Sequence, residues 1–272
     1  MELGHQAKEH FLETLWGYYA GHGRHDLPWR QAEAGSSFDP YKIMVSELML
    51  QQTQVMRVIP KYQAFTEQFT NTRELARAEL GDVLRAWQGL GYNRRAKYLW
   101  QAAQIVDNLK YFPKTSEELL RLPGIGVNTA GAIMAYAYNS PAIFVETNVR
   151  TVYIHHFYSD RTGVTDKEIL TLLEQTLDHE HPREFYWALM DYGSHLKATV
   201  GNLNKASKQY TKQSQFQGSR RQVRGKILRL LGVQAYVPSA LLAALSDERS
   251  EAVIQALLAE GLIRQTKGQY HL

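Results

Sequence analysis

A tight glycine turn is the first stretch of this sequence that could form a binding site. Residues 122–131 read LPGIGVNTAG, so Gly124 and Gly126 flank one isoleucine just before a run of small residues. A Gly-x-Gly turn lets successive backbone N–H groups converge, and the following helix presents its positive N-terminus there. This pattern favours an anion, which on a nucleic-acid duplex would be a backbone phosphate. A plain helix–helix turn in the core is the alternative.

Two glutamates lie where a carboxylate could do acid–base or electrostatic chemistry. Glu47 lies in IMVSELML, an otherwise apolar helix face on which burial would raise its pKa. Glu146 lies in FVETNVR, before helical residues. An exposed helix glutamate is the alternative for Glu47, and an acid that complements the helix dipole is the alternative for Glu146. The adjacent His155 and His156 face different sides of a helix, so we expect no metal site.

The elements that must position these groups are helices. Apolar residues recur at helical spacing through the first 200 residues, with short connections rich in glycine or proline, and the alternation typical of a parallel sheet is absent. Ser116 is placed to cap the helix that contains Leu119. The helical stretches are 10–20, 40–65, 79–91, 94–109, 116–122, 128–138, 148–158, 166–177 and 182–196.

The character of the chain changes after Leu196. No acidic residue lies between Tyr192 and Ser246, whereas nine lysines and arginines do, so positive charge is concentrated here. Because like charges repel unless a polyanion neutralises them, this stretch favours contact with phosphates, although a solvated linker is the alternative. The next residues predict three helices and a hairpin that turns at Lys267-Gly268, an order that resembles a winged-helix module. Ser246 is the expected N-cap of its third helix.

Composition excludes several classes of protein. The 272 residues include no cysteine, which rules out disulfides, thiolate catalysis and thiolate-held metal clusters. The net charge of +4 fits a polyanionic partner. No apolar run is long enough for a membrane span, and the first residues lack the apolar core of a signal peptide. We therefore expect a cytoplasmic, nucleoid-associated protein without cofactors.

Several separated motifs resemble the HhH-GPD superfamily of DNA glycosylases, and within it the MutY-type adenine glycosylases. The resemblance covers about residues 10–196, and the phrase SELMLQQTQV favours the MutY type because endonuclease III carries glutamine at the position of Glu47. The matching motifs are LPWR (27–30), DPYKIMVSELMLQQTQVMRVIPKYQAF (39–65), WQGLGYNRRAKYLWQAA (87–103), LPGIG-x-x-TAGAI (122–133), FVETNVRTV (144–152) and ALMDYG (188–193).

The resemblance implies roles for individual residues. Glu47 would protonate the leaving purine and then activate water, Glu146 would stabilise the cationic sugar, and Asn148 would orient that carboxylate. Gln52 and Tyr92 would enter the duplex when the target nucleotide is flipped out. Arg30 and Asp191 would contact the base, unless they pair with each other structurally. The expected DNA- and base-binding set is Arg30, Gln51, Gln52, Thr53, Tyr92, Gly124, Gly126, Asn128, Thr129 and Asp191.

The sequence differs from endonuclease III at position 128, and it departs from the MutY-type pattern in three further features. Asn128 stands where endonuclease III has a lysine nucleophile; an amide forms no imine, so we expect no β-lyase activity. Glu146-Thr147 replaces the family's Asp-Gly. The four cysteines that hold a [4Fe–4S] cluster in most relatives are missing after ALMDYG, and a winged-helix-like segment stands in place of the Nudix-like domain that recognises 8-oxoguanine opposite adenine.

These observations predict an all-α helix-hairpin-helix glycosylase core, two helical subdomains with a cleft between them, followed by a small winged-helix-like module. We expect a monomer that binds double-stranded DNA containing a lesion or mismatch and excises a purine, adenine first. Excision of another damaged base, and a non-catalytic DNA-binding protein, are the alternatives. The expected boundaries are a core at 1–200 (six-helix part about 37–145, the remainder from 1–36 and 146–200), a basic linker at 201–219 and the module at 220–272.

Overall fold

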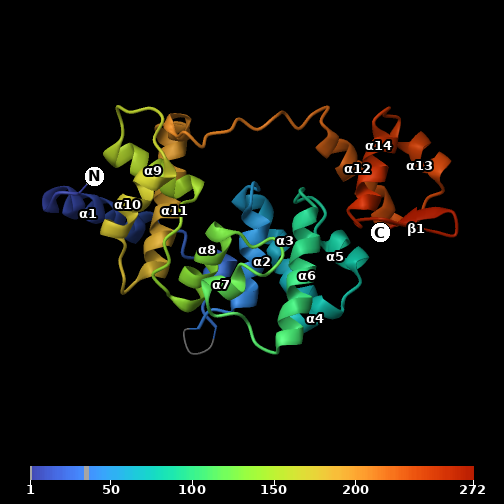
Figure 1. Cartoon of the computed structure of the whole chain (residues 1–272), viewed down its shortest axis with the longest axis horizontal. Helices are drawn as coiled ribbons and strands as arrows, with labels where there is room; N and C mark the ends of the chain where they lie inside the picture. The colour runs from blue at the N-terminus through green and yellow to red at the C-terminus, as the bar shows by residue number, and fades with distance from the viewer. Residues whose placement is uncertain (1, 34–36) are drawn as a thin grey trace. The chain divides into compact units, whose positions relative to one another are not determined.

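The computed structural model describes residues 2–33 and 37–272 and is predominantly helical, as the sequence predicts (Figure 1). Two short strands, β1 (Arg264–Thr266) and β2 (Gln269–His271), pair antiparallel with Thr266 opposite Gln269. Lys267 and Gly268 turn this hairpin with positive φ angles of 49° and 76°, which confirms the expected turn. No helix in the described part of the chain is both long and apolar enough to cross a membrane.

The chain divides into two compact units, each with its own hydrophobic core. The first unit comprises Met1–Ile43, Lys114–Leu120 and Ile125–Lys212, and the second comprises Met44–Pro113, Arg121–Gly124 and Gln213–Leu272. The C-terminal residues therefore group with the helices of residues 44–113. That residues 220–272 form a winged-helix-like module, and the other expected domain boundaries, stay predictions.

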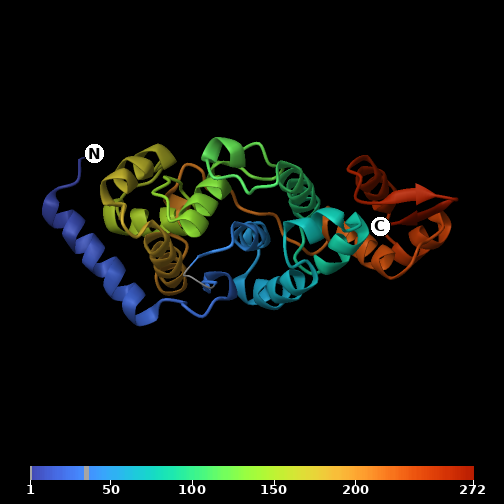
Figure 2. The same ribbon diagram turned by 90° about the horizontal axis from the view of Figure 1, so that it is seen from below.

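The first unit contains α1, η1, the start of α2, α7 to α11 and η2. Their bounds are α1 (His5–His22), η1 (Pro28–Arg30), α2 (Pro40–Leu50), α7 (Ser116–Leu119), α8 (Val127–Tyr138), α9 (Thr147–Phe157), α10 (Asp166–Thr176), α11 (Pro182–Thr199) and η2 (Leu203–Ala206). Helix α11 packs on both α1 and α9 (Figures 1 and 2). A Cβ at Gly193 of α11 would lie 2.5 Å from the backbone oxygen of Asn148, so only glycine permits this close approach of α11 to α9.

The second unit contains the end of α2, α3 to α6, α12 to α14 and the hairpin. Their bounds are α3 (Val55–Gln68), α4 (Thr72–Arg77), α5 (Leu80–Ala86), α6 (Arg94–Leu109), α12 (Arg220–Val233), α13 (Pro238–Leu245) and α14 (Ser250–Ala259). Its core includes the fully buried Trp87 between α5 and α6. Helix α12 packs on α5, α13 and α14, and its Val223 and Ile227 are buried.

Two of the expected helix caps are wrong by a few residues. Ser116 is the first residue of α7, and the side chain of Thr115 before it accepts the N–H of Glu118. Ser246 does not begin α14; it ends α13 with a φ of 50°. A serine can serve either end of a helix, so its presence alone does not decide where the backbone leaves the helical conformation.

Candidate functional site

Glu47 lies near the C-terminal end of α2, on a side of the helix that is partly exposed, whereas the residues beside it are buried. Its neighbours Ser46 and Leu48 are fully buried, whereas Glu47 itself is half-buried. After Leu50 the helix ends, and the turn at 51–54 separates α2 from α3. A half-buried carboxylate keeps access from outside, which a general acid requires.

A buried arginine that the sequence reasoning missed holds this end of α2. The guanidinium of Arg95, which is 7% exposed, donates to the backbone oxygens of Leu48, Met49 and Gln51 at 2.5, 3.0 and 2.6 Å. Carbonyl groups at the C-terminal end of a helix lack intrahelical partners, so Arg95 donates the hydrogen bonds that the carbonyl oxygens at the end of α2 lack. Burial lowers the pKa of Arg95 to about 10, and it therefore stays charged at neutral pH.

The same guanidinium also fixes a second loop. Its other amino group donates to the backbone oxygens of Leu90 and Gly91 at 3.2 and 3.1 Å and to the hydroxyl of Thr53 at 3.2 Å. The turns at 51–54 and 88–93 are thereby held together, although they are almost 40 residues apart in the chain. A signal was present in the sequence, because Arg95 falls on the buried stripe of α6 with Ala96 and Leu99.

Gln52 and Tyr92 project from these two turns. Both adopt left-handed backbone conformations, with φ angles of 54° and 46°, which cost energy for residues other than glycine. Both are exposed, and the hydroxyl of Tyr92 accepts hydrogen bonds from Gln213 and, at 2.8 Å, from Arg221. The structure thus brings together Gln52, Thr53 and Tyr92, three of the residues that the sequence predicted to contact DNA.

The glycine turn at 124–126 leads into α8 with an open helix N-terminus. Gly124 has a φ of 78°, and a Cβ there would meet the Cβ of Tyr98 at 2.7 Å. Both the backbone conformation and the lack of space therefore require glycine at this position. Gly126 is the N-cap of α8, and a Cβ there would meet no atom within 4 Å. The first turn of α8 contains no acidic residue, which suits a bound anion. Thr129 is buried within α8.

Glu146 is the N-cap residue of α9, at the end of an irregular segment that three contacts hold in place. The hydroxyl of Tyr186 in α11 donates to the backbone oxygen of Ala142 at 2.8 Å, and the two rings of Tyr186 and Phe144 stack 4.0 Å apart. The side-chain amide of Asn128 donates to the backbone oxygen of Val145 at 2.8 Å. Asn128 therefore links the start of α8 to the residue before Glu146.

The electrostatic surroundings of Glu146 favour its protonated form. Burial raises the pKa of Glu146 to about 7, and the positive charge of Arg150 opposes this only in part. Arg150 is bound instead to Asp166, with two N–H···O contacts of 2.7 and 2.8 Å. The side-chain amide of Asn148 donates to the backbone oxygen of Met190 at 3.1 Å, and its role in orienting Glu146 stays a prediction.

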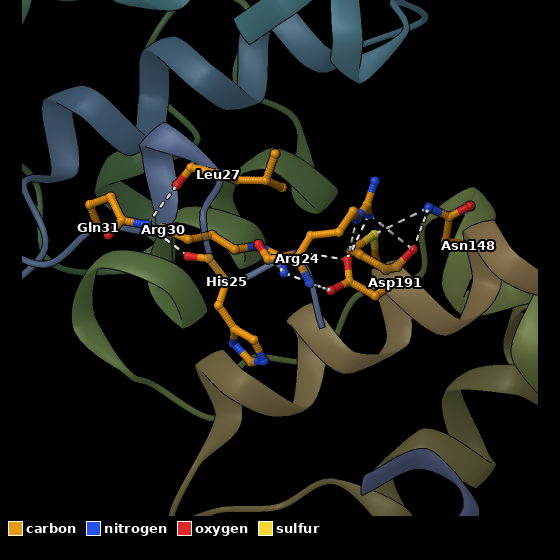
Figure 3. A network of polar contacts seen from close by, with 8 residues as sticks. Arg24, His25, Leu27, Arg30, Gln31, Asn148 and Asp191 are labelled. Atoms are coloured by element: carbon orange, nitrogen blue, oxygen red, sulfur yellow. Dashed lines mark hydrogen bonds and ion pairs between the residues drawn. The ribbon is translucent and has the colours of Figure 1, made fainter. Parts of the chain in front are cut away.

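Asp191 is paired inside the first unit, which is the structural alternative that the sequence left open (Figure 3). Arg30 donates to both carboxylate oxygens at 2.8 and 2.9 Å, and Arg24 adds its side chain at 2.7 Å and its backbone N–H at 2.8 Å. Burial alone would raise the pKa of Asp191, but the hydrogen bonds and charges of the two arginines outweigh it and hold the pKa below its usual value.

The segment after α11, where the resemblance implies four cysteines, is held without thiolates. The buried amide of Asn204 in η2 donates to the hydroxyl of Thr151 at 2.6 Å and to the backbone oxygen of Thr147 at 3.3 Å. Val164 exchanges backbone hydrogen bonds of 3.0 and 2.8 Å with Ala206 and Lys208. Because the whole chain lacks cysteine, this segment does not offer the ligands of an iron–sulfur cluster.

The two adjacent histidines take part in packing. His156 lies 5.2 Å from the ring of Phe11 and 5.6 Å from that of Tyr192, and burial lowers its pKa to about 4. Within residues 2–33 and 37–272, no group of three histidine or carboxylate side chains is arranged to hold a metal ion.

Comparisons with known proteins agree with this arrangement. Residues 45–179 match the family model described as HhH-GPD superfamily base excision DNA repair protein. The chain is 34% identical to the adenine DNA glycosylase of Mycolicibacterium smegmatis over 270 residues, which cover 90% of each chain. It is also 34% identical to the adenine DNA glycosylase of Buchnera aphidicola subsp. Baizongia pistaciae and 36% identical to that of Homo sapiens. These two matches span 60% and 35% of the relatives' lengths and 76% and 68% of this chain.

Solved structures show the same fold. A non-covalent endonuclease III–DNA complex has a TM-score of 0.60 at 18% identity and covers 73% of this chain and 90% of its own. A thermostable thymine-DNA glycosylase has a TM-score of 0.59 at 24% identity and covers 70% of this chain and 87% of its own.

Proposed function

Because the chain belongs to the HhH-GPD superfamily of base excision DNA repair proteins, we propose that it is a DNA glycosylase that removes mispaired adenine. The observation that carries the proposal is Glu47, a half-buried carboxylate on the buried end of α2, in a chain that matches an adenine DNA glycosylase along nearly its full length. The proposed partner is double-stranded DNA with a mismatch or lesion, bound by a monomer.

In the proposed reaction, Glu47 donates a proton to N7 of the purine, which makes the base a better leaving group. As the glycosidic bond breaks, positive charge develops on the deoxyribose, and the ionised carboxylate of Glu146 stabilises it. Glu47, now ionised, accepts a proton from the water that attacks C1′. The meeting of these two carboxylates across one nucleoside remains a prediction from the sequence.

Glu146 replaces the aspartate of the resembling family with a side chain that is one methylene longer. The contacts of Tyr186 and Asn128 hold the backbone on either side of it, so the carboxylate has a defined point of attachment. A displacement of about 1 Å can change a rate by about 10²-fold, so Glu146→Asp tests whether the site is built for the longer acid. We expect this variant to be slower than the wild type.

DNA contact in this proposal begins with the backbone. The open N-terminus of α8 after Gly126 would bind a phosphate, and the exposed side chains of Gln52 and Tyr92 would fill the space left by the flipped nucleotide. Gln51, which lies one helical turn after Glu47, would lie at the edge of the same contact. Such contacts explain why two residues keep a left-handed backbone that costs energy in the free protein.

The proposed enzyme stops after base removal. Its side chain at 128 is an amide that donates to Val145, and an amide does not attack C1′ to form an imine. The reaction would therefore leave an abasic site that breaks only in alkali. We further propose that it needs no iron–sulfur cluster, because Asn204 and the backbone of 206–208 hold the segment after α11.

The decisive experiment compares Glu47→Gln with a matched change elsewhere in the second unit. Single-turnover excision is measured on duplexes that carry adenine opposite guanine, 8-oxoguanine or thymine, together with a panel of other single lesions, each with and without alkali. We expect Glu47→Gln to lower the rate by about 10²–10⁴-fold without weakening duplex binding, and the exposed Glu67→Gln to leave it unchanged. Excision by Glu47→Gln within tenfold of wild type would contradict the assignment of Glu47 as the general acid. Nicking without alkali would contradict the proposal that the enzyme leaves an abasic site.

A further inference from the structure

Arg150 follows Glu146 by four residues at the start of α9. Its backbone N–H donates to the backbone oxygen of Glu146 at 2.9 Å, so the two residues are one helical turn apart. A glutamate followed four residues later by a cationic side chain has the spacing and order that favour an ion pair on a helix. Within the described part of the chain, however, Arg150 pairs with Asp166 and not with Glu146.

Asp166 holds this guanidinium from the neighbouring helix. It is the first residue of α10, which packs on α9, and its two carboxylate oxygens accept from Nε and Nη2 of Arg150 at 2.7 and 2.8 Å. Such a two-point contact fixes the orientation of a guanidinium as well as its position. Only 14% of the Arg150 side chain and 30% of the Asp166 side chain are exposed, so solvent screens this pair less than a surface pair.

The charge near Glu146 depends mainly on Arg150, which acts on it from the same helix. From α11, the hydroxyl of Tyr186 is the titratable group near Glu146, and burial raises the pKa of this hydroxyl, so it is neutral where Glu146 titrates. Helix α8 contains no charged residue, and Lys205 of η2 is exposed. The charge that Glu146 meets is therefore set by whether Asp166 neutralises Arg150.

The proposed reaction requires an unpaired carboxylate at Glu146. Positive charge develops on the deoxyribose as the glycosidic bond breaks, and an ionised carboxylate beside it stabilises this charge. A carboxylate that is already paired with a guanidinium stabilises the sugar less, and a guanidinium without a counter-charge repels the developing cation. By binding Arg150, Asp166 prevents both effects.

We propose that Asp166 is a positioning residue for base excision, which binds and neutralises Arg150 so that the carboxylate of Glu146 stays unpaired for the cationic transition state. The proposal rests on the proposed function, because it needs Glu146 to face a cationic sugar. Asp166 acts only through Arg150 and touches no reacting atom. While it is bound to Asp166, Arg150 lowers the pKa of Glu146 only in part, so its release should lower that pKa further.

The first test measures single-turnover excision of adenine between pH 5 and 9, with the protein in saturating excess so that duplex binding does not limit the rate. We expect Asp166→Asn to lower the rate at pH 8 by about tenfold or more and to move the midpoint of the rising limb to lower pH. Asp166→Asn together with Arg150→Met should return the rate at pH 8 to within about threefold of wild type, because the released charge is then absent.

Glu168→Gln is the matched control. Glu168 lies in the same first turn of α10, forms the capping box with Thr165 and pairs with Arg161 rather than with Arg150. This variant should change neither the rate at pH 8 nor the midpoint. The proposal is overturned if Asp166→Asn excises like wild type over the whole pH range. It is also overturned if the double variant is as slow as Asp166→Asn, which is the behaviour of a purely structural residue.

A second measurement needs no catalysis and separates this proposal from the proposed function. The carboxyl group of Glu146 is titrated by ¹³C NMR in the free protein labelled at the glutamate δ-carbons, and its signal is identified by its absence from Glu146→Gln. We expect a lower pKa for Glu146 in Asp166→Asn than in wild type, and an unchanged pKa would overturn the proposal. If this shift is present in a chain that excises no adenine, the proposed function is wrong, whereas the control of the charge at Glu146 by Asp166 stands.

Discussion

Replacing Arg95 with methionine should destabilise the second unit and misplace the turns at 51–54 and 88–93. Three acceptors of Arg95, the backbone oxygens of Leu48, Met49 and Leu90, are fully enclosed and would lose their partner. A buried polar group left without a hydrogen bond costs about 1–3 kcal/mol, and water can reach the remaining acceptors. We therefore expect the free energy of unfolding to fall by about 3–5 kcal/mol.

The assay is urea-induced unfolding followed by tryptophan fluorescence, with single-turnover excision measured in parallel. Arg95→Lys is the informative companion, because an ammonium group has three donors at one point and cannot reach both turns at once. We expect it to recover part of the stability and little of the activity. A loss below about 1 kcal/mol in Arg95→Met, with normal excision, would refute the reasoning that this side chain organises the site.

Three further predictions follow from the charges of the two units. The excision rate should rise with pH through about 7 as Glu146 ionises, and Glu146→Gln should remove this pH dependence. Glu146→Gln should also be more stable than wild type at pH 8 but not at pH 5. The reason is that a carboxyl group whose pKa is raised by folding destabilises the folded state as pH rises above the pKa of the unfolded chain. Asp191→Asn should cost about 3–5 kcal/mol in thermal or urea unfolding, since it leaves the buried Arg30 without its counter-charge. Glu260→Gln should lower the free energy of unfolding by about 1–2 kcal/mol at pH 7 and by little near pH 2. The two arginines hold the pKa of Glu260 at about 2, so the stability that its charge contributes is lost as pH falls from about 4.5 through about 2. An equal loss at both pH values would contradict the ion-pair explanation.

Local patterns were enough to predict most of the secondary structure and the family. Helical periodicity, the glycine turn at 124–126 and the Lys267-Gly268 hairpin depend on residues that are close together in the chain, so the sequence alone predicts them. The lack of thiolate ligands also follows from composition alone. The two serine caps were misplaced because several residues near each helix end could act as the cap equally well. The backbone conformation in the folded protein determines which of them does.

The partners of the polar side chains were decided by the tertiary structure. Arg95 reaches carbonyls more than 40 residues away, and Arg24 and Arg30 enclose an aspartate more than 160 residues away. The sequence shows which side chains can donate or accept hydrogen bonds. In the folded protein a buried donor pairs with an acceptor that helix packing places near it, because a buried donor without a hydrogen bond costs more free energy than local side-chain preferences contribute. The sequence by itself therefore determined which carboxylates could do chemistry, and only the packing of the helices decided that Asp191 is held by two arginines while Glu47 and Glu146 remain partly exposed.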